Sequence, residues 1–331
     1  MFCLRVNCRS IFSGFVFKCN SARMSSREVT FPKSIEGFGY KFNEQGRLRK
    51  LDKQTGEITE NPFEFNVSTD SSYNQRHYEA LGETITHYVY DLLESEGLRR
   101  LPLPKDENNA SFIFCTENVD SADKLIILIH GSGVVRAGQW ARSLIINDCL
   151  DSGTQIPYIK KATQLGYGVY VLNTNDNHRV VDGNKQSIPG SSSPQEHANT
   201  FWNNYISESR AQKIAIVAHS FGGIVTMSLA SQFEEDFLNR VFAIGLTDSV
   251  HGKIPRAVSS VLADHLSKIG RNWVSSTDPL DSPLPEQPGE IQCVSAGIAK
   301  HELTSWYCIG SLFKFLEERS DLRVVSAQES L

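Results

Sequence analysis

Residues 213–223 read KIAIVAHSFGG, a short apolar run that ends at a serine and continues into an apolar helical pattern. The segment Ala218–Gly222 matches the G-x-S-x-G nucleophile elbow, with alanine in place of the first glycine. The residues two positions before and after the serine must be small, because a serine on a strained strand-to-helix turn brings the chain close to itself. We therefore expect Ser220 at the carboxyl end of a strand, where the N-terminal amides of the next helix favour a developing oxyanion.

Strand and helix patterns alternate on both sides of this motif. Short apolar runs rich in β-branched residues predict strands at 124–129, 167–172, 213–218, 241–246, 272–275 and 291–295, and helical patterns lie at 139–147, 194–210, 223–238, 257–269 and 304–319. This alternation predicts a doubly wound, mainly parallel α/β sheet with helices on both faces. An extension precedes it, since residues 38–67 predict a hairpin and the apolar period from Ser71 to Gly97 predicts a helix.

The composition narrows the classes of function. The 331 residues include 33 Lys and Arg against 38 Asp and Glu, a net charge of −5, so strong direct nucleic-acid binding by the folded body is not expected. No apolar run of about 18 residues occurs, which argues against a transmembrane helix. The seven cysteines lack metal-type spacing and indicate reduced thiols, and we expect neither a metal nor another cofactor.

The chain is expected to have three parts. Residues 1–30 form a basic leader, disordered or targeting, in which residues 1–27 contain five basic and no acidic residues. A mitochondrial or secretory address is one interpretation of this leader, and translation from Met24, which would delete most of it, is another. Residues 31–319 are expected to form a single domain, and residues 320–331 a short tail.

The remaining groups of a serine-hydrolase site have candidates near other strand ends. The glycine-rich turn 130–133, HGSG, follows a strand, so the amides of Ser132 and Phe221 are candidates for an oxyanion hole. His301 is our choice of general base, because it follows the last strand and so completes the chain order serine, acid, histidine. His251 is the reserve base, and His219 is expected to pack or hydrogen-bond locally.

Three aspartates are candidates for the acid that orients the base. Asp248 ends the strand after the elbow helix, whereas Asp278 and Asp281 follow the next strand, in a proline-rich loop. Asp248 and Asp281 rank about level, and the sequence does not choose among the three.

Several longer segments carry a specific resemblance. They are HGSGVVRAGQWAR at 130–142, AHSFGG at 218–223, LTDSVH at 246–251, SAG at 295–297 and HELTSW at 301–306. With them the chain resembles the Argonaute-binding-protein-two domain family, most closely its animal cotranscriptional-regulator branch, over about residues 31–318. The resemblance implies an α/β-hydrolase-like fold with Ser220 at the nucleophile position. It also implies nuclear roles with Argonaute-type, chromatin or splicing proteins; related domains accompany histone deacetylases.

Two main hypotheses of function follow. The first is a regulator of gene expression, through cotranscriptional or splicing control, heterochromatin or small-RNA silencing, that resides in the nucleus and cytoplasm. The second is an active serine hydrolase of esterase type, in which Ser220 attacks an acyl carbonyl, His301 is the base and an aspartate orients it. A third hypothesis is a pseudoenzyme that keeps the serine because the elbow supports the fold.

Overall fold

The computed structural model describes residues 30–105, 107, 110–255, 258–285 and 289–328. The chain divides into two units, Met1–Phe31 and Pro32–Leu331, and every helix and strand below belongs to the second. The leader segment 1–27, with its targeting hypothesis, lies outside the described residues.

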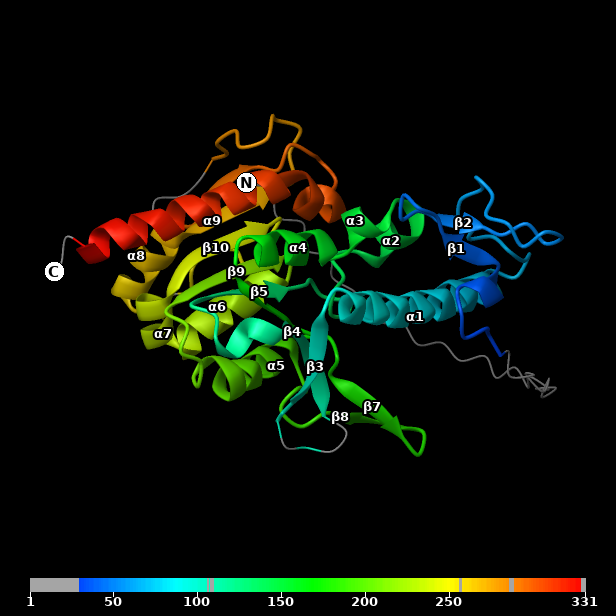
Figure 1. Ribbon diagram of the computed structural model, residues 1–331, viewed down its shortest axis with the longest axis horizontal. Helices are drawn as coiled ribbons and strands as arrows, with labels where there is room; N and C mark the ends of the chain where they lie inside the picture. Colours follow the sequence, from blue (N-terminus) through cyan, green and yellow to red (C-terminus); the bar gives the residue numbers. More distant parts are fainter. Residues whose placement is uncertain (1–29, 106, 108–109, 256–257, 286–288, 329–331) are drawn as a thin grey trace, which may run out of the picture. The chain divides into compact units, whose positions relative to one another are not determined.

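An eight-stranded sheet forms the centre of the second unit, with strand order β12-β11-β10-β9-β5-β6-β4-β3 (Figure 1). The strands are β3 (Leu98–Leu103), β4 (Ser111–Thr116), β5 (Lys124–Ile129), β6 (Gly168–Val171), β9 (Lys213–His219), β10 (Val241–Thr247), β11 (Gly270–Val274) and β12 (Gln292–Ser295). All neighbours from β12 to β6 pair in parallel, and β4 pairs antiparallel with both β6 and β3. The predicted mainly parallel sheet is therefore confirmed, and β3 and β4 add an antiparallel edge to it.

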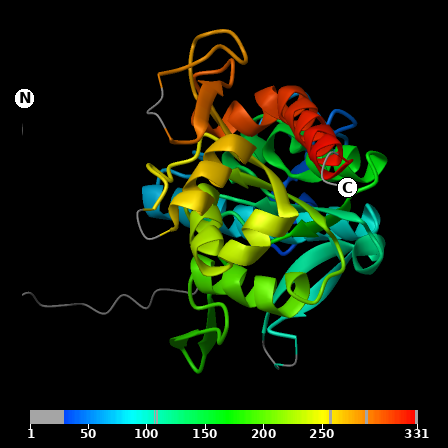
Figure 2. The same cartoon turned by 90° about the vertical axis from the view of Figure 1, so that its left-hand side faces the viewer.

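The central strands are apolar along their length because helices cover both faces of the sheet. Every residue of β10 is buried, and so is every residue of β9 after Lys213. The covering helices are α4 (Ile156–Gln164), α5 (Pro194–Phe201), α6 (Gly222–Gln232), α7 (Glu234–Arg240), α8 (Ser260–Ile269) and α9 (Thr304–Gln328). The helices α5, α6, α7 and α8 lie on one face of the sheet, and α4 and α9 lie on the other (Figure 2). Each face has its own apolar core, formed by buried side chains of the strands and of the helices on that side.

The N-terminal extension adds a third core. Its hairpin consists of β1 (Tyr40–Phe42) and β2 (Leu48–Lys50), and its helix is α1 (Ser71–Ser95), so both predicted elements are present. Asp70 caps α1, with its carboxylate accepting from the amides of Ser72 and Tyr73 at 2.9 and 3.3 Å. Apolar side chains of the hairpin and of α1 pack together with α2 (Arg142–Asn147). The extension is thereby joined to the segment that follows β5.

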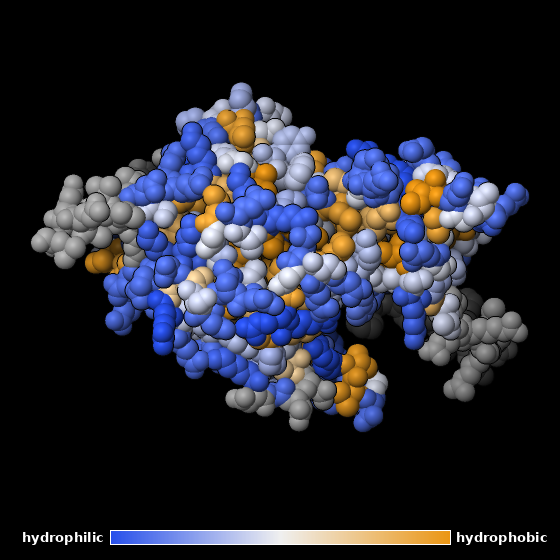
Figure 3. All heavy atoms as spheres, in the orientation of Figure 1, coloured by the Kyte–Doolittle hydropathy of each residue, from blue (hydrophilic) through white to orange (hydrophobic). Residues whose placement is uncertain are grey.

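Several short elements complete the unit. They are the hairpin of β7 (His178–Val181) and β8 (Asn184–Ser187), α3 (Leu150–Gly153), the 3-10 turns η1 (Glu36–Phe38), η2 (Glu117–Asp120) and η4 (His301–Leu303), and the π-helical turn η3 (Trp202–Ile206). Figure 3 shows a largely hydrophilic surface with an apolar patch at the β7–β8 hairpin, where Val180 and Val181 are exposed. Among the described residues, no helix is long and apolar enough to cross a bilayer.

Several elements differ from the sequence-based expectation. The helix predicted at 223–238 is two helices, since the chain leaves helical geometry at Phe233 between α6 and α7. The helix α4 was not predicted, and α9 continues to Gln328, past its expected end at Arg319.

Candidate functional site

Ser220 lies on a tight turn between β9 and α6. Its φ of +53° lies in the left-handed region, and its amide donates to the Thr247 carbonyl at 3.0 Å. A side chain at Gly222 would bring Cβ to 2.7 Å from the Ile129 carbonyl oxygen, closer than the packing allows. The turn therefore requires glycine two residues after the serine, as the elbow motif predicts.

His301 is the first residue of η4, and Asp248 follows β10. Asp248 Oδ2 lies 2.7 Å from His301 Nδ1, and Asp248 Oδ1 accepts from the Ser275 amide at 3.0 Å. The amide of Asp248 donates to the Trp273 carbonyl at 2.7 Å. The residue has a φ of +45°, so the backbone leaves the strand conformation where this side chain begins. Two backbone contacts from β11 and the residue after it thus fix the carboxylate that contacts His301.

The electrostatics of this pair assign the tautomer of His301. The hydrogen bond from the Asp248 carboxylate raises the pKa of His301 above its ordinary value, against partial burial. Burial alone would raise the pKa of Asp248, but the hydrogen bonds from His301 and Ser275 outweigh it and lower that pKa. Because the carboxylate is ionised, His301 Nδ1 carries a proton and donates it, so Nε2 of the neutral ring has the lone pair of a base.

The other two candidate aspartates make different contacts. Asp281 Oδ1 accepts from the Trp273 indole N–H at 2.8 Å and from the Ser311 hydroxyl. Asp278 Oδ2 accepts from Ser276 Oγ at 3.1 Å. Asp248 is therefore the aspartate that the fold brings to His301, while Asp281 links β11 to α9.

His219, which precedes the serine in the chain, and His251, which follows β10, have other partners. His219 is buried and donates from Nδ1 to the Thr247 carbonyl at 2.9 Å, and its ring contacts that of His301 at a tilt of 36°, with the ring centroids 4.7 Å apart. Burial lowers the pKa of His219 to about 3. The Nδ1 atom of His251 lies 2.7 Å from the Ser249 hydroxyl. His219 packs locally as expected, and His251 does not line the pocket that holds Ser220.

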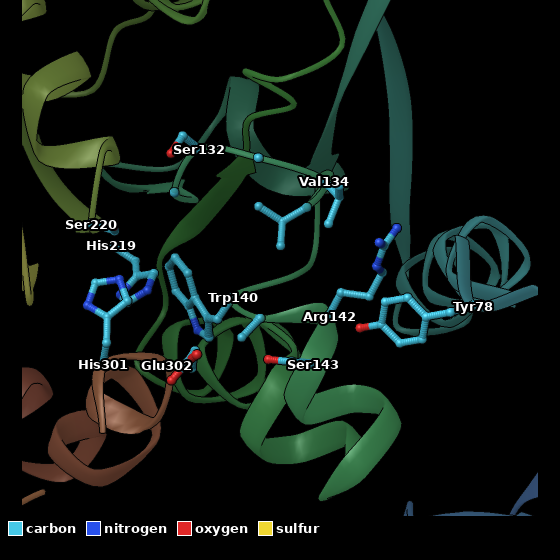
Figure 4. A pocket seen from close by; sticks show the side chains of 14 residues that line it. Tyr78, Ser132, Val134, Trp140, Arg142, Ser143, His219, Ser220, His301 and Glu302 are labelled. Carbon is cyan, nitrogen blue, oxygen red and sulfur yellow. The ribbon is translucent and has the colours of Figure 1, made fainter. Parts of the chain in front are cut away.

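A pocket of about 390 Å³ brings the serine, the histidine and the glycine-rich turn together (Figure 4). Its lining includes Ser220, His301, Ser132 and the two glycines of that turn. Within the described part of the chain, neither the Ser132 amide nor the Phe221 amide donates a hydrogen bond. No group of three His, Cys, Asp or Glu side chains among the described residues is placed to hold a metal ion.

The remaining lining residues were not found by sequence reasoning. Tyr78, from α1, and Arg142, from α2, lie on the other side of the pocket from Ser220 and His301 in Figure 4, and Glu302 follows the histidine. The Arg142 guanidinium lies over the Tyr78 ring, 5.4 Å from its centroid. Nothing in the sequence pairs residue 78 with residue 142, because their contact depends on how α1 packs against α2.

Comparison with known proteins agrees with the predicted resemblance. A sequence model of the Arb2 domain matches residues 31–280. "Cotranscriptional regulator ARB2A homolog" of Gallus gallus is 42% identical over 89% of this chain and 82% of its own length, and "Cotranscriptional regulator ARB2A" of Homo sapiens is 40% identical over 92% and 84%. A histone deacetylase from Saccharomyces cerevisiae superposes with a TM-score of 0.49 at 15% identity, over 74% of this chain and 98% of its own. The match of the domain model, together with the two relatives, shows that this chain belongs to the Arb2 domain family.

Proposed function

We propose that this protein is a cotranscriptional regulator that acts in the nucleus through protein partners. The observation that carries the proposal is the identity of 40–42% to relatives named as cotranscriptional regulators, over more than four fifths of their length. The net charge of −5 also favours protein partners over direct contact with nucleic-acid phosphates. Argonaute-type, chromatin and splicing proteins are the partner classes that the family resemblance suggests.

The regulatory role is tested by removing the protein from cells and measuring exon inclusion across the transcriptome. Loss of the protein should change splicing, and re-expression of the wild-type chain should restore it. Unchanged exon usage, together with no nuclear fraction of the protein, would contradict the proposal.

A second function, serine-hydrolase activity, is favoured by one specific observation. Ser220 is held at a positive φ and lines the same pocket as His301, which is fixed by an ionised aspartate at 2.7 Å between Asp248 Oδ2 and His301 Nδ1. In this proposal Ser220 is the nucleophile, His301 the general base and Asp248 the residue that orients it. The amides of Ser132 and Phe221 form the oxyanion hole.

The proposed reaction is the hydrolysis of an ester. Ser220 Oγ attacks the carbonyl carbon while its proton passes to His301 Nε2, and the two amides stabilise the resulting oxyanion. The carbon–oxygen bond to the alcohol then breaks, and His301 returns the proton to the leaving alcohol. Water, deprotonated by His301, attacks the acyl-enzyme, which releases the carboxylic acid and regenerates the Ser220 hydroxyl.

Labelling of the purified protein with a fluorophosphonate probe tests the activity of the serine. The activated oxygen displaces fluoride from phosphorus, so wild-type protein should become labelled and Ser220→Ala should not. Folded wild-type protein that remains unlabelled would contradict hydrolase activity.

The same variant separates the two functions in cells. If Ser220→Ala restores splicing as well as wild type, the regulatory role does not use the hydrolytic site. If it fails to restore splicing while its partner binding and folding are intact, regulation depends on the chemistry of Ser220.

A further inference from the structure

Arg142 is a buried cation without a counter-ion. The residue is only 9% exposed, and among the described residues its guanidinium makes no ion pair and donates no hydrogen bond. Its Nε atom is buried and unpartnered. Arginine stays charged at every physiological pH, and a buried charge is costly unless it is paired.

The surroundings of Arg142 hold the guanidinium in place without neutralising it. The Tyr78 ring lies on one side, 5.4 Å from Cζ, and its π face attracts the cation but offers no lone pair in the plane of the N–H groups. On another side the guanidinium packs against Gly82 of α1, where an added Cβ would lie 2.7 Å from Nη1. A glycine at this position is what gives the side chain room to lie flat against the helix. The planar guanidinium of Arg142 is thus held in position, and its N–H groups donate no hydrogen bond within the described residues.

This cation lines the same pocket as Ser220 and His301. In Figure 4, Arg142 and Tyr78 lie on one side of the pocket and the two histidine rings on the other, with Trp140 between them. Val134 and Val135 add apolar surface to the lining. The pocket therefore has a candidate nucleophile at one end, apolar walls, and an unpaired cation at the other end.

We propose that Arg142 binds the carboxylate of an ester substrate whose acyl group carries a single negative charge remote from the scissile carbonyl. The inference rests on the proposed hydrolase function and names its substrate class. A guanidinium matches a carboxylate through two parallel N–H···O bonds, and such an acceptor would satisfy the donors that the protein leaves free. The pocket volume of about 390 Å³ is sufficient for an acyl chain of several carbons.

The charge of the pocket selects a monoanion over a phosphate. One arginine supplies a single positive charge, and Glu302 places a negative charge in the same lining. A phosphate monoester, with a charge of about −1.5 to −2 at neutral pH, would lack a second cation. Glu302 follows His301 in the chain, so its charge repels the anionic end of a ligand from the histidine and favours the orientation in which that end meets Arg142.

The test compares anionic esters with neutral esters of equal chain length. Mono-p-nitrophenyl adipate and suberate are measured against p-nitrophenyl hexanoate and octanoate, and the readout is the ratio of kcat/KM between the anionic and the neutral member of each pair. For wild-type protein we expect a ratio of about 10 or more for at least one chain length, as for one charge-assisted hydrogen-bonded pair. A wild-type ratio near one for both lengths would overturn the inference while leaving the hydrolase activity established.

Variants connect the preference to the named residue. Arg142→Gln should bring the ratio to about one or below, because Glu302 remains, Arg142→Lys should give an intermediate ratio, and Glu302→Gln should raise it. Arg99→Gln is the matched control, because it removes an arginine charge from an exposed ion pair with Asp120 outside the pocket lining. A ratio that falls equally in the Arg99 and Arg142 variants would refute a role for the pocket arginine. If Arg142→Gln does not fold, the wild-type ratio and Arg142→Lys decide the question.

A binding measurement separates this inference from the proposed hydrolysis. Titration calorimetry follows monomethyl adipate and methyl hexanoate binding to wild-type protein and to Ser220→Ala. Binding of the anion alone, lost in Arg142→Gln, supports the carboxylate site even if Ser220 proves unreactive toward the fluorophosphonate. Equal affinity for the two esters would overturn it.

Discussion

Acidification from pH 7 to pH 5 should destabilise this domain through three buried histidines. Burial lowers the pKa of His130 to about 4 and the pKa values of His197 and His219 to about 3. Nε2 of His197 accepts from the Asn173 amide at 3.2 Å, which only a neutral ring can do. Nδ1 of His130 and of His219 each lies within 2.9 Å of a carbonyl oxygen, a contact that raises the pKa and that burial outweighs. These rings stay neutral at pH 5 in the folded state, whereas the unfolded chain binds a proton on each.

The magnitude follows from proton linkage. With an unfolded pKa of about 6.5, each histidine contributes a loss of about 1.8 kcal/mol in the free energy of unfolding between pH 7 and pH 5, or about 5 kcal/mol for the three. Any folded pKa of 4 or below gives nearly the same loss, because the folded ring then stays neutral between pH 7 and pH 5 and only the unfolded chain takes up a proton. His301 has the opposite sign: its raised pKa contributes stability that is present below the unfolded pKa and lost as pH rises through the folded pKa.

Urea unfolding, followed by tryptophan fluorescence at pH 7, 6, 5.5 and 5, measures this loss. His197→Gln should reduce the pH dependence by about a third, and His87→Gln is the matched control because it removes an exposed imidazole. A decrease below about 2 kcal/mol between pH 7 and pH 5 would refute the reasoning. So would NMR titration that finds these three rings protonated in the folded protein near pH 6.

Three further predictions concern the site and the turn that holds it. Asp248→Asn should slow fluorophosphonate labelling by about 10²- to 10⁴-fold. Asp281→Asn should leave the labelling rate within a few-fold of wild type and lower the free energy of unfolding in urea by about 1–3 kcal/mol. Equal labelling rates in the two variants would contradict the assignment of Asp248 as the acid. The labelling rate should rise with pH through a midpoint above 6.5, because the base must be unprotonated and Asp248 raises the pKa of His301. In a series of labelling reactions stopped at fixed times, Asp248→Asn should shift that midpoint to lower pH. An unshifted midpoint would contradict the assignment of the raised pKa to Asp248. Gly222→Ala should abolish labelling and destabilise the protein by about 2 kcal/mol or more. Gly310→Ala, which has open space around the added methyl group, should stabilise α9 by up to about 1 kcal/mol. Similar melting temperatures for the two variants would argue against the close contact between residue 222 and the Ile129 carbonyl.

The sheet was predictable where the sequence carries a local signal. β5, β9 and β10 are apolar runs bounded by polar residues, and their predicted positions match the structure within one residue. The helix α4 was missed although Ile156, Ile159 and Ala162 form a buried face at helical spacing, because the helix has only nine residues and begins with a proline in its first turn. The break at Phe233 was equally hidden, since a helical pattern continues through it and only tertiary packing turns the chain there.

Some residues of the candidate site could also be predicted from the sequence, whereas others could not. The placement of Ser220 and His301 follows from motif and chain order, because both need only a position at a strand end. The choice between Asp248 and Asp281 depends on which aspartate faces His301, and that depends on the geometry of β10 and β11. The role proposed for Arg142 could not be predicted at all, because it depends on a missing partner, and a sequence does not show which charges remain unpaired.

The position of α1 has a consequence for how this protein can diversify. Ser220, His301 and Asp248 stand at the ends of the sheet strands, whereas Tyr78 and the glycine that seats the arginine belong to a helix that precedes the sheet in the chain. Under the proposed hydrolase function, substitutions in α1 would alter the choice of acyl group without disturbing the groups that would break its ester bond. The N-terminal extension would then be an exchangeable specificity element attached to a constant chemical core, and selection could act on each separately.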